Sequence, residues 1–259
     1  MVNTSISLET IEYFLLIMVR ISCFVSVAPF YGMTNTPARV KIGFSALVSI
    51  LLYGILPHPA LEYTDVIGYA TIVVREGITG LLIGFAANIC NSIILLSGNI
   101  IDMNIGLSMA TEYDPITQTN SPITGNFYNN LLLLLLIVTD MHHYILHAIA
   151  DSYQVIAIGG TVFRWDSLMT SMVTFMTHSM VIGFRIALPV FACTMILNCI
   201  LGIMSKVAPQ MNMFSVGMQL KVLVGFVVMF LTIRLLPYVS DFIFTEMKRM
   251  MVSIIKGLY

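Results

Sequence analysis

The sequence predicts an all-α integral membrane protein with roughly six or more hydrophobic helices and helical hairpins, some of them broken. Of its 259 residues, 58% are hydrophobic and only 10% are charged, whereas about a quarter of the residues in soluble domains are charged. The mean hydropathy is +0.93. Apolar runs occupy about 11–31, 42–57, 72–101, 127–149, 172–204 and 216–238. These runs, separated by short polar joints, set the architecture because lipid is the solvent.

The first run follows a segment without Lys or Arg and without a small-residue cleavage pattern. It therefore does not resemble a removable signal peptide, and we expect the first helix to be retained. The net charge of −1 provides no basic surface for nucleic acid. The four cysteines, Cys23, Cys90, Cys193 and Cys199, lie inside apolar runs without metal-type spacing, so we interpret them as small packed hydrophobic residues.

Basic residues cluster after the first run, at Arg39 and Lys41, and in the C-terminal tail, at Lys248, Arg249 and Lys256. Both clusters favour the cytoplasm under the positive-inside rule. Simple spanning by every run would place them on opposite sides of the bilayer. Either the helix count differs from six, or some helices do not cross.

The third and fifth runs exceed the ~20 residues that span a bilayer, so each is tilted, broken or a pair of helices. The third run carries glycines at helical spacing and amides beyond them, a pattern that allows close helix packing and hydrogen bonds between helices. Arginines inside apolar runs cost about 2.5–3.5 kcal/mol at mid-bilayer and should face protein or water. We expect a subunit-packing surface that includes Gly77, Gly80, Gly84, Asn88, Asn91, Arg20 and Arg185.

The longest polar interruption covers residues 106–126. One interpretation is a surface loop. Its small residues Gly106, Ser108 and Ala110 also suit a tight passage at membrane depth, where a loop is tolerated only if protein or a water-filled cavity surrounds it.

A second polar cluster places Asp140, His143, His147 and Asp151 on one helix face at 100° per residue. Imidazoles and carboxylates in this arrangement suit a metal. One helix would have to supply every ligand, however, and two of the four residues lie at its ends, where polar residues are common. We favour packing or hydrogen bonding at the helix ends, and we expect no metal and no cofactor.

Catalytic motifs are absent from the sequence. It contains no Gly-rich phosphate loop after a strand, no GxSxG and no HExxH. We therefore expect a protein that is not an enzyme.

Polar residues also interrupt the most membrane-like region, between the fifth and sixth runs. Pro209, Gln210 and Asn212 predict a turn between two apolar helices, whose amides and the nearby Lys206 must meet water or a partner.

Four blocks of the sequence together resemble the R/T subunit family of type III secretion export gates. The blocks are RISCFVSVAPFYGMTNTPARVKIG (20–43), VREGITGLLIGF (74–85), SGNIIDMNIGLSMATEYDP (97–115) and the stretch from Gly183 to Lys221, with APQMN as its most specific element. The VGMQLK sequence around Gly217 is more similar to the flagellar branch than to the virulence injectisome branch.

The resemblance implies a non-enzymatic subunit of the flagellar export gate in the bacterial cytoplasmic (inner) membrane and the flagellar basal body. Its partners would be the P and Q subunits, the B-type switch subunit and unfolded exported proteins. Residues 1–170 would be similar to a P subunit, with a plug-like loop at 106–122. Residues 171–259 would be similar to a Q hairpin with a basic tail.

The resemblance also implies two sites. The pore plug would contain Gly106, Leu107, Ser108, Met109, Ala110, Asp114 and Pro115. The hairpin tip at the cytoplasmic entrance would contain Lys206, Pro209, Gln210, Asn212, Phe214 and Lys221. The alternatives are a virulence injectisome subunit, a small-solute transporter with broken helices, and an intramembrane metalloenzyme built on His143 and His147.

Overall fold

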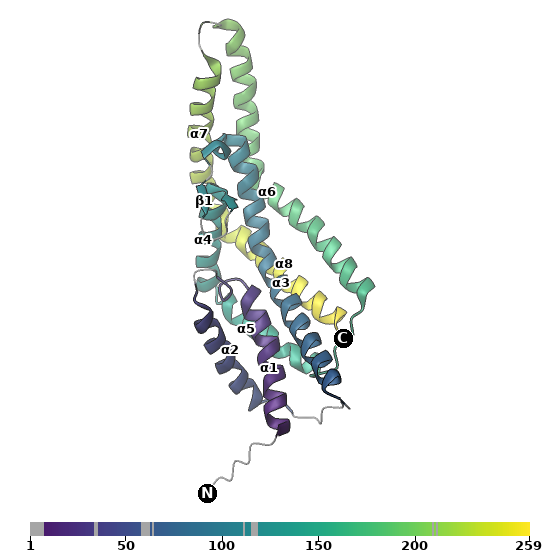
Figure 1. Ribbon diagram of the computed structural model, residues 1–259. Coiled ribbons are helices and arrows are strands. Elements are labelled where there is room, and N and C mark those ends of the chain that lie inside the picture. Colours follow the sequence, from purple (N-terminus) through teal and green to yellow (C-terminus); the bar gives the residue numbers. More distant parts are fainter. Residues whose placement is uncertain are drawn as a thin grey trace. The chain divides into compact units, whose positions relative to one another are not determined.

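A computed structural model (Figure 1) describes residues 8–33, 36–57, 63, 65–110, 112–114, 119–208, 210 and 212–259. Within these ranges the chain forms eight α-helices, two short 3-10 helices and one antiparallel pair of three-residue strands. The predicted all-α class is confirmed, although the small strand pair was not predicted. The elements are α1 Leu8–Val27, α2 Ala38–Tyr53, α3 Val66–Ile105, η1 Leu107–Ala110, β1 Glu112–Asp114, β2 Thr119–Ser121, α4 Ile123–Val138, α5 Met141–Val155, α6 Trp165–Val207, α7 Met213–Thr232, η2 Ile233–Leu235 and α8 Leu236–Gly257.

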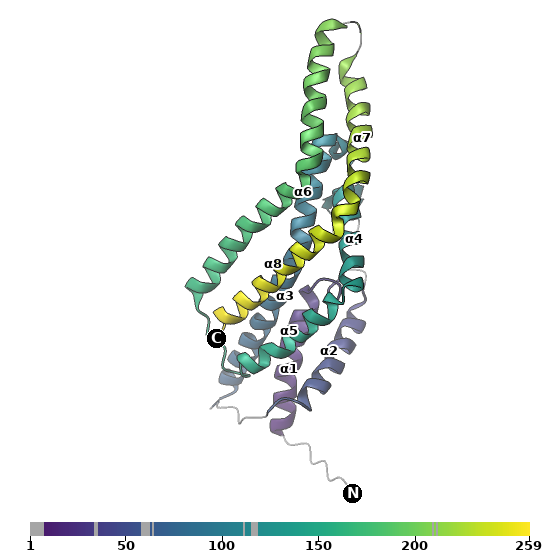
Figure 2. The same cartoon turned by 180° about the vertical axis from the view of Figure 1, so that it is seen from behind.

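Four stretches of the described chain are long and apolar enough to cross a membrane, and the α4–α5 pair would make a fifth as a broken span. The third and fifth apolar runs are each one long helix, α3 with 40 residues and α6 with 43. Pro189 lies inside α6, where proline removes a backbone hydrogen bond and kinks a helix. Both views show that α6 is bent (Figures 1 and 2).

The fourth apolar run is broken between α4 and α5. Asp140 at this break adopts a left-handed backbone conformation, with φ of 55°, which is uncommon for residues other than glycine. The sixth run ends earlier than expected. The 3-10 turn η2 separates α7 from α8, and α8 continues almost to the C-terminus.

The chain divides into two compact units. The first contains residues 1–89, 140–174 and 246–259, and the second contains residues 90–139 and 175–245. The boundary predicted at 170/171 concerns likeness to other subunits rather than compactness, so it stays a prediction.

In the first unit, α1 packs tightly against α3. Leu16, Ile17, Phe24 and Ile83 are fully buried here. A Cβ added at Gly80 would lie 2.1 Å from the carbonyl oxygen of Arg20, so the backbones meet where α3 has no side chain. The segment before α6 is held by the end of α8, because Val162 N–H and Arg164 N–H donate to the carbonyls of Leu258 and Gly257 at 3.1 Å.

In the second unit, the end of α3 packs against α4 and α7. A Cβ added at Gly98 would lie 2.1 Å from the Cα of Gly125, so α3 and α4 touch backbone to backbone. A Cβ added at Gly225 of α7 would lie 2.4 Å from the Cδ1 of Ile105. These contacts position both predicted functional segments, which lie in this unit.

Candidate functional site

The α6–α7 hairpin consists of α6 from residue 175 onward, the joint at 208–212, and α7. The part of α6 that follows its bend runs beside α7 toward the joint in both views (Figures 1 and 2). Gly217 is buried, and a Cβ there would lie 3.0 Å from the Cδ1 of Leu201, so glycine allows close packing of α7 on α6. Asn212 begins α7, and its side chain accepts a hydrogen bond from Ser215 N–H at 3.5 Å. This is the capping role that asparagine favours.

The structure brings three of the six predicted tip residues together at the end of this hairpin. Lys206, Gln210 and Asn212 are all exposed there. Pro209 lies outside the described residues, and so does the side chain of Phe214. Lys221 is half-buried and lies more than two turns into α7, about 12 Å along the helix from its start, so it is not at the tip.

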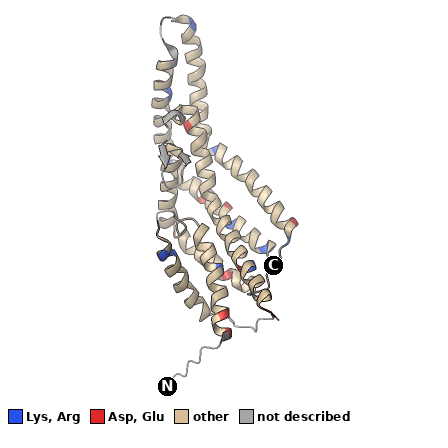
Figure 3. Ribbon diagram, viewed as in Figure 1, with Lys and Arg blue, Asp and Glu red and all other residues tan. Residues whose placement is uncertain are grey.

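The sides of the hairpin are apolar and exposed. Only 17% of an apolar 18-residue window of α6 is buried, and 11% in the stretch Ser215–Gly257, against 56% in α3. Charged residues are sparse along it (Figure 3). The large exposed side chains on α7 are Leu220, Leu223, Phe226, Val227, Phe230 and Leu231. A continuous apolar surface of this kind requires cover by lipid or by another protein.

The predicted plug segment, residues 106–122, begins where α3 ends. Gly106 has φ of +93°, a left-handed conformation that glycine adopts freely and that commonly terminates helices. Leu107, Ser108, Met109 and Ala110 form the single turn η1. A Cβ at Gly106 would lie 3.8 Å from the Cγ of Met218, so the segment starts beside α7.

The rest of the plug segment contains the strand pair. β1 ends at Asp114 and pairs antiparallel with β2, with Asp114 opposite Thr119. Pro115 lies outside the described residues, as do the side chains of Met109, Ala110 and Asp114. The role of the segment in a pore stays a prediction.

Buried polar contacts hold the two ends of the plug segment together. The carboxylate of Asp102, near the end of α3, accepts hydrogen bonds from the hydroxyl of Thr124 and from Thr124 N–H, the latter at 3.2 Å. Both residues are almost fully buried. This role of Asp102 was not predicted, although an acid inside an apolar run indicates a polar partner.

The predicted subunit-packing residues fall into different environments. Gly77, Gly80 and Gly84 all face α1 of the same chain, with a Cβ at Gly84 lying 2.8 Å from the carbonyl oxygen of Phe24. The half-buried Asn88 and Asn91 have interactions within the chain. The close approach expected of the glycines therefore occurs inside the molecule, and contact of this helix with another subunit stays a prediction.

The two arginines of this set differ more sharply. Arg20 is fully buried, and its Nε lies 2.5 Å from Oε2 of the equally buried Glu76. Its guanidinium also donates to the carbonyl of Ile156 at 3.3 Å and lies 4.1 Å from the ring centre of Tyr153. Arg185 is exposed instead, at a cavity of about 220 Å³ that Tyr238 and Phe242 also line.

Glu76 is the residue that the sequence analysis missed here. Its second oxygen, Oε1, accepts a hydrogen bond from Gly159 N–H at 3.0 Å. The pair therefore joins α1, α3 and the segment after α5. The available signal was the presence of opposite charges, Arg20 and Glu76, inside two apolar runs.

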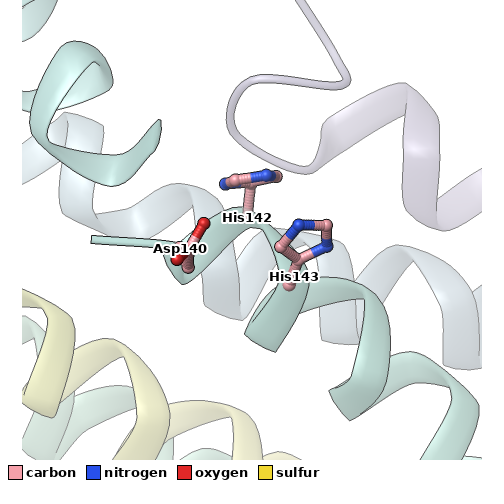
Figure 4. A group of neighbouring side chains, drawn as sticks. All are labelled: Asp140, His142 and His143. Carbon is pink, nitrogen blue, oxygen red and sulfur yellow. The ribbon is translucent and has the colours of Figure 1, made fainter. Parts of the chain in front are cut away.

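Metal-ligating side chains gather at the start of α5, in a different set from the one considered on sequence grounds. Asp140, His142 and His143 bring their ligand atoms within 4.8 Å of one another (Figure 4). His147 and Asp151 are not part of this group. Asp140 precedes α5 with a left-handed backbone, so regular helical spacing does not describe its position relative to His147 and Asp151.

These features define an all-α integral membrane protein. Its α1 and α3 pack against each other, and its α6–α7 hairpin has apolar sides that lipid or another protein must surround. The sequence pattern of the bacterial export proteins, family 1, matches residues 11–247, and the chain belongs to this family. The chain is also similar to three proteins named flagellar biosynthetic protein FliR. It is 29% identical to that of Bacillus subtilis (strain 168), with 83% of this chain and 84% of the relative covered. It is 26% identical to that of Pectobacterium carotovorum (93% and 91% covered) and 24% identical to that of Escherichia coli K12 (93% and 92% covered).

Proposed function

We propose that this chain is a membrane component of the flagellar protein-export apparatus and that it is not an enzyme. The observation that carries the proposal is the family match, which covers residues 11–247. The relatives that share most of its length are named as flagellar biosynthetic proteins. These names favour the flagellar branch over a virulence injectisome and over a small-solute transporter.

The finer proposal is that the chain forms part of the gate through which unfolded flagellar substrates cross the bacterial inner membrane. The P and Q subunits would cover the apolar sides of the α6–α7 hairpin, and the B-type switch subunit would bind the same assembly. The apolar surfaces of α6 and α7 are mostly unburied within this chain, which supports such an assembly because lipid or protein must surround them. The polar tip, with Lys206, Gln210 and Asn212, would lie at the cytoplasmic entrance.

The plug segment would close the resting gate. A pore wide enough for an unfolded chain also passes ions, so the closed state needs a seal that can move. Small residues from Gly106 to Ala110 can pack across a narrow axis. The Asp102–Thr124 contact anchors the segment at both ends, which leaves the part between them available to move.

Deletion of residues 106–115 tests this role. The remaining residues 116–122 can reach about 23 Å when extended, and α3 already touches α4 at Gly98 and Gly125, so the helices should keep their packing. We expect cells that overproduce the assembled gate with this deletion to become permeable to ions and small solutes.

A chain lacking only residues 117–121 is the control, and it should leak much less. Assembly of both variants is checked by co-purification with the P and Q subunits. Equal background leakage from two assembled variants would show that the segment is an ordinary surface loop. Failure of the wild-type chain to restore motility and secretion in a strain lacking its own family member would overturn the proposed function itself.

A further inference from the structure

The cluster at the start of α5 consists of one carboxylate and two imidazoles from residues that are nearly consecutive. The ligand atoms of Asp140, His142 and His143 lie within 4.8 Å of one another. Asp140 and His143 are exposed, and His142 is half-buried. Figure 4 shows the three side chains around the first turn of the helix, with the two rings on neighbouring positions. The ring centres of His142 and His143 are 4.1 Å apart.

Two of these side chains retain the capacity to bind a ligand. Asp140 occupies the N-cap position of α5, but its side chain forms no capping hydrogen bond. The Nδ1 atom of His142 is buried and has no hydrogen-bond partner among the described residues. Buried polar atoms without a partner are unusual and call for an explanation such as an ion or a water molecule.

The backbone beneath the cluster is held from the segment after α1. The hydroxyl of Tyr31 donates to the carbonyl oxygen of His142 at 3.1 Å, and the ring of Tyr31 stacks on Phe44 with centres 5.3 Å apart. Phe30 lies beside the His142 ring, with centres 6.0 Å apart. The hydrogen bond from Tyr31 therefore holds the backbone of His142 in place.

We propose that Asp140, His142 and His143 form a site for a divalent transition-metal cation of the zinc type, a role beyond the proposed export function. Two imidazoles and one carboxylate with a remaining position for water form a common ligand set for zinc and its neighbours. The cation would tie Asp140 to the first turn of α5 and thereby fix the start of this helix. This inference replaces the sequence-based expectation of no metal, which was reached for a different set of residues, Asp140, His143, His147 and Asp151.

The test is zinc binding by the full chain, purified in detergent with a tag that contains no histidine. Zinc is added, excess is removed, and bound metal is measured by elemental analysis and by competition with a chromophoric chelator. We expect about one ion per chain, with loss of at least tenfold in affinity in His143→Ala and in Asp140→Asn. Both substitutions change exposed side chains, so the fold should survive; circular dichroism and elution volume check this.

His147→Ala is the matched control, because His147 is exposed on the same helix but lies outside the cluster. Retained binding in this variant, together with loss in the other two, supports the site. The proposal is overturned if the wild-type chain binds no zinc, if His143→Ala or Asp140→Asn binds like the wild type, or if His147→Ala removes binding.

Discussion

The α1–α3 contact and the α6–α7 hairpin are both made from strongly apolar helices, but they bury their surfaces very differently. The mean hydropathies of their candidate spans are 1.8 and 1.9 for α1 and α3, and 2.3 and 2.2 for the spans that contain α6 and α7. More than half of an apolar α3 window is buried inside the molecule, against about a sixth in α6. Hydropathy therefore does not determine whether a membrane helix packs within its own chain.

Small and paired polar residues account for the difference. On α3, glycines face the α1 backbone, and Glu76 pairs with Arg20. On α6 a Cβ at Gly202 would meet nothing within 4 Å, and the exposed faces of the hairpin carry large apolar side chains. In the α1–α3 contact, glycines on one helix and a pair of opposite charges thus accompany packing within the chain.

Removal of Glu76 should have the largest effect on the α1–α3 contact. Glu76→Ala leaves the Arg20 guanidinium fully buried without its counter-charge, and breaking a buried pair in this way costs about 3–5 kcal/mol. We expect a lower level of the chain in membranes and a lower unfolding temperature in detergent. The double variant Arg20→Met with Glu76→Leu, which removes both charges, should recover part of the loss. Wild-type stability of the single variant would show that the pair is dispensable.

A methyl group at Gly80 should have the next largest effect. Its Cβ would lie 2.1 Å from the carbonyl oxygen of Arg20, and the backbone of α1 must move away to admit it. Overpacking typically costs about 1–3 kcal/mol, and a clash with backbone should reach the upper end. Gly43→Ala is the matched control, because no atom lies within 4 Å of a Cβ there. Equal thermal unfolding of the two variants would contradict close packing at Gly80.

The long apolar runs and the polar joint at 209–212 could be predicted from the sequence because lipid solvation fixes their composition. The family resemblance was equally accessible, since it rests on contiguous blocks. Gly80 packs against α1 of the same chain, whereas its predicted contact with another subunit stays a prediction, because spacing along one helix shows that a neighbour approaches without showing which neighbour.

Three features depend on local geometry that periodicity does not carry. The left-handed backbone at Asp140 breaks the fourth run, and Asp140 therefore leaves the regular helix face on which it was predicted. The strand pair at 112–114 and 119–121 is too short for a period-two pattern. The contact of Asp102 with Thr124 joins residues 22 positions apart, and only the fold brings them together.

Substitutions at the hairpin tip should have the smallest effect on stability. They should nevertheless reduce export. Gln210→Ala with Asn212→Ala removes two exposed amides. The Asn212 cap contributes about 1 kcal/mol at most for a bond as long as 3.5 Å. We therefore expect unchanged unfolding temperature and unchanged co-purification with the P and Q subunits, together with reduced secretion and motility. Asn212→Ser is the control for the cap, because serine also caps helices; it should unfold like the wild type. Normal secretion and motility in the double alanine variant would show that the exposed amides of the tip have no part in export, and the contrast with the α1–α3 contact would then be one of packing alone.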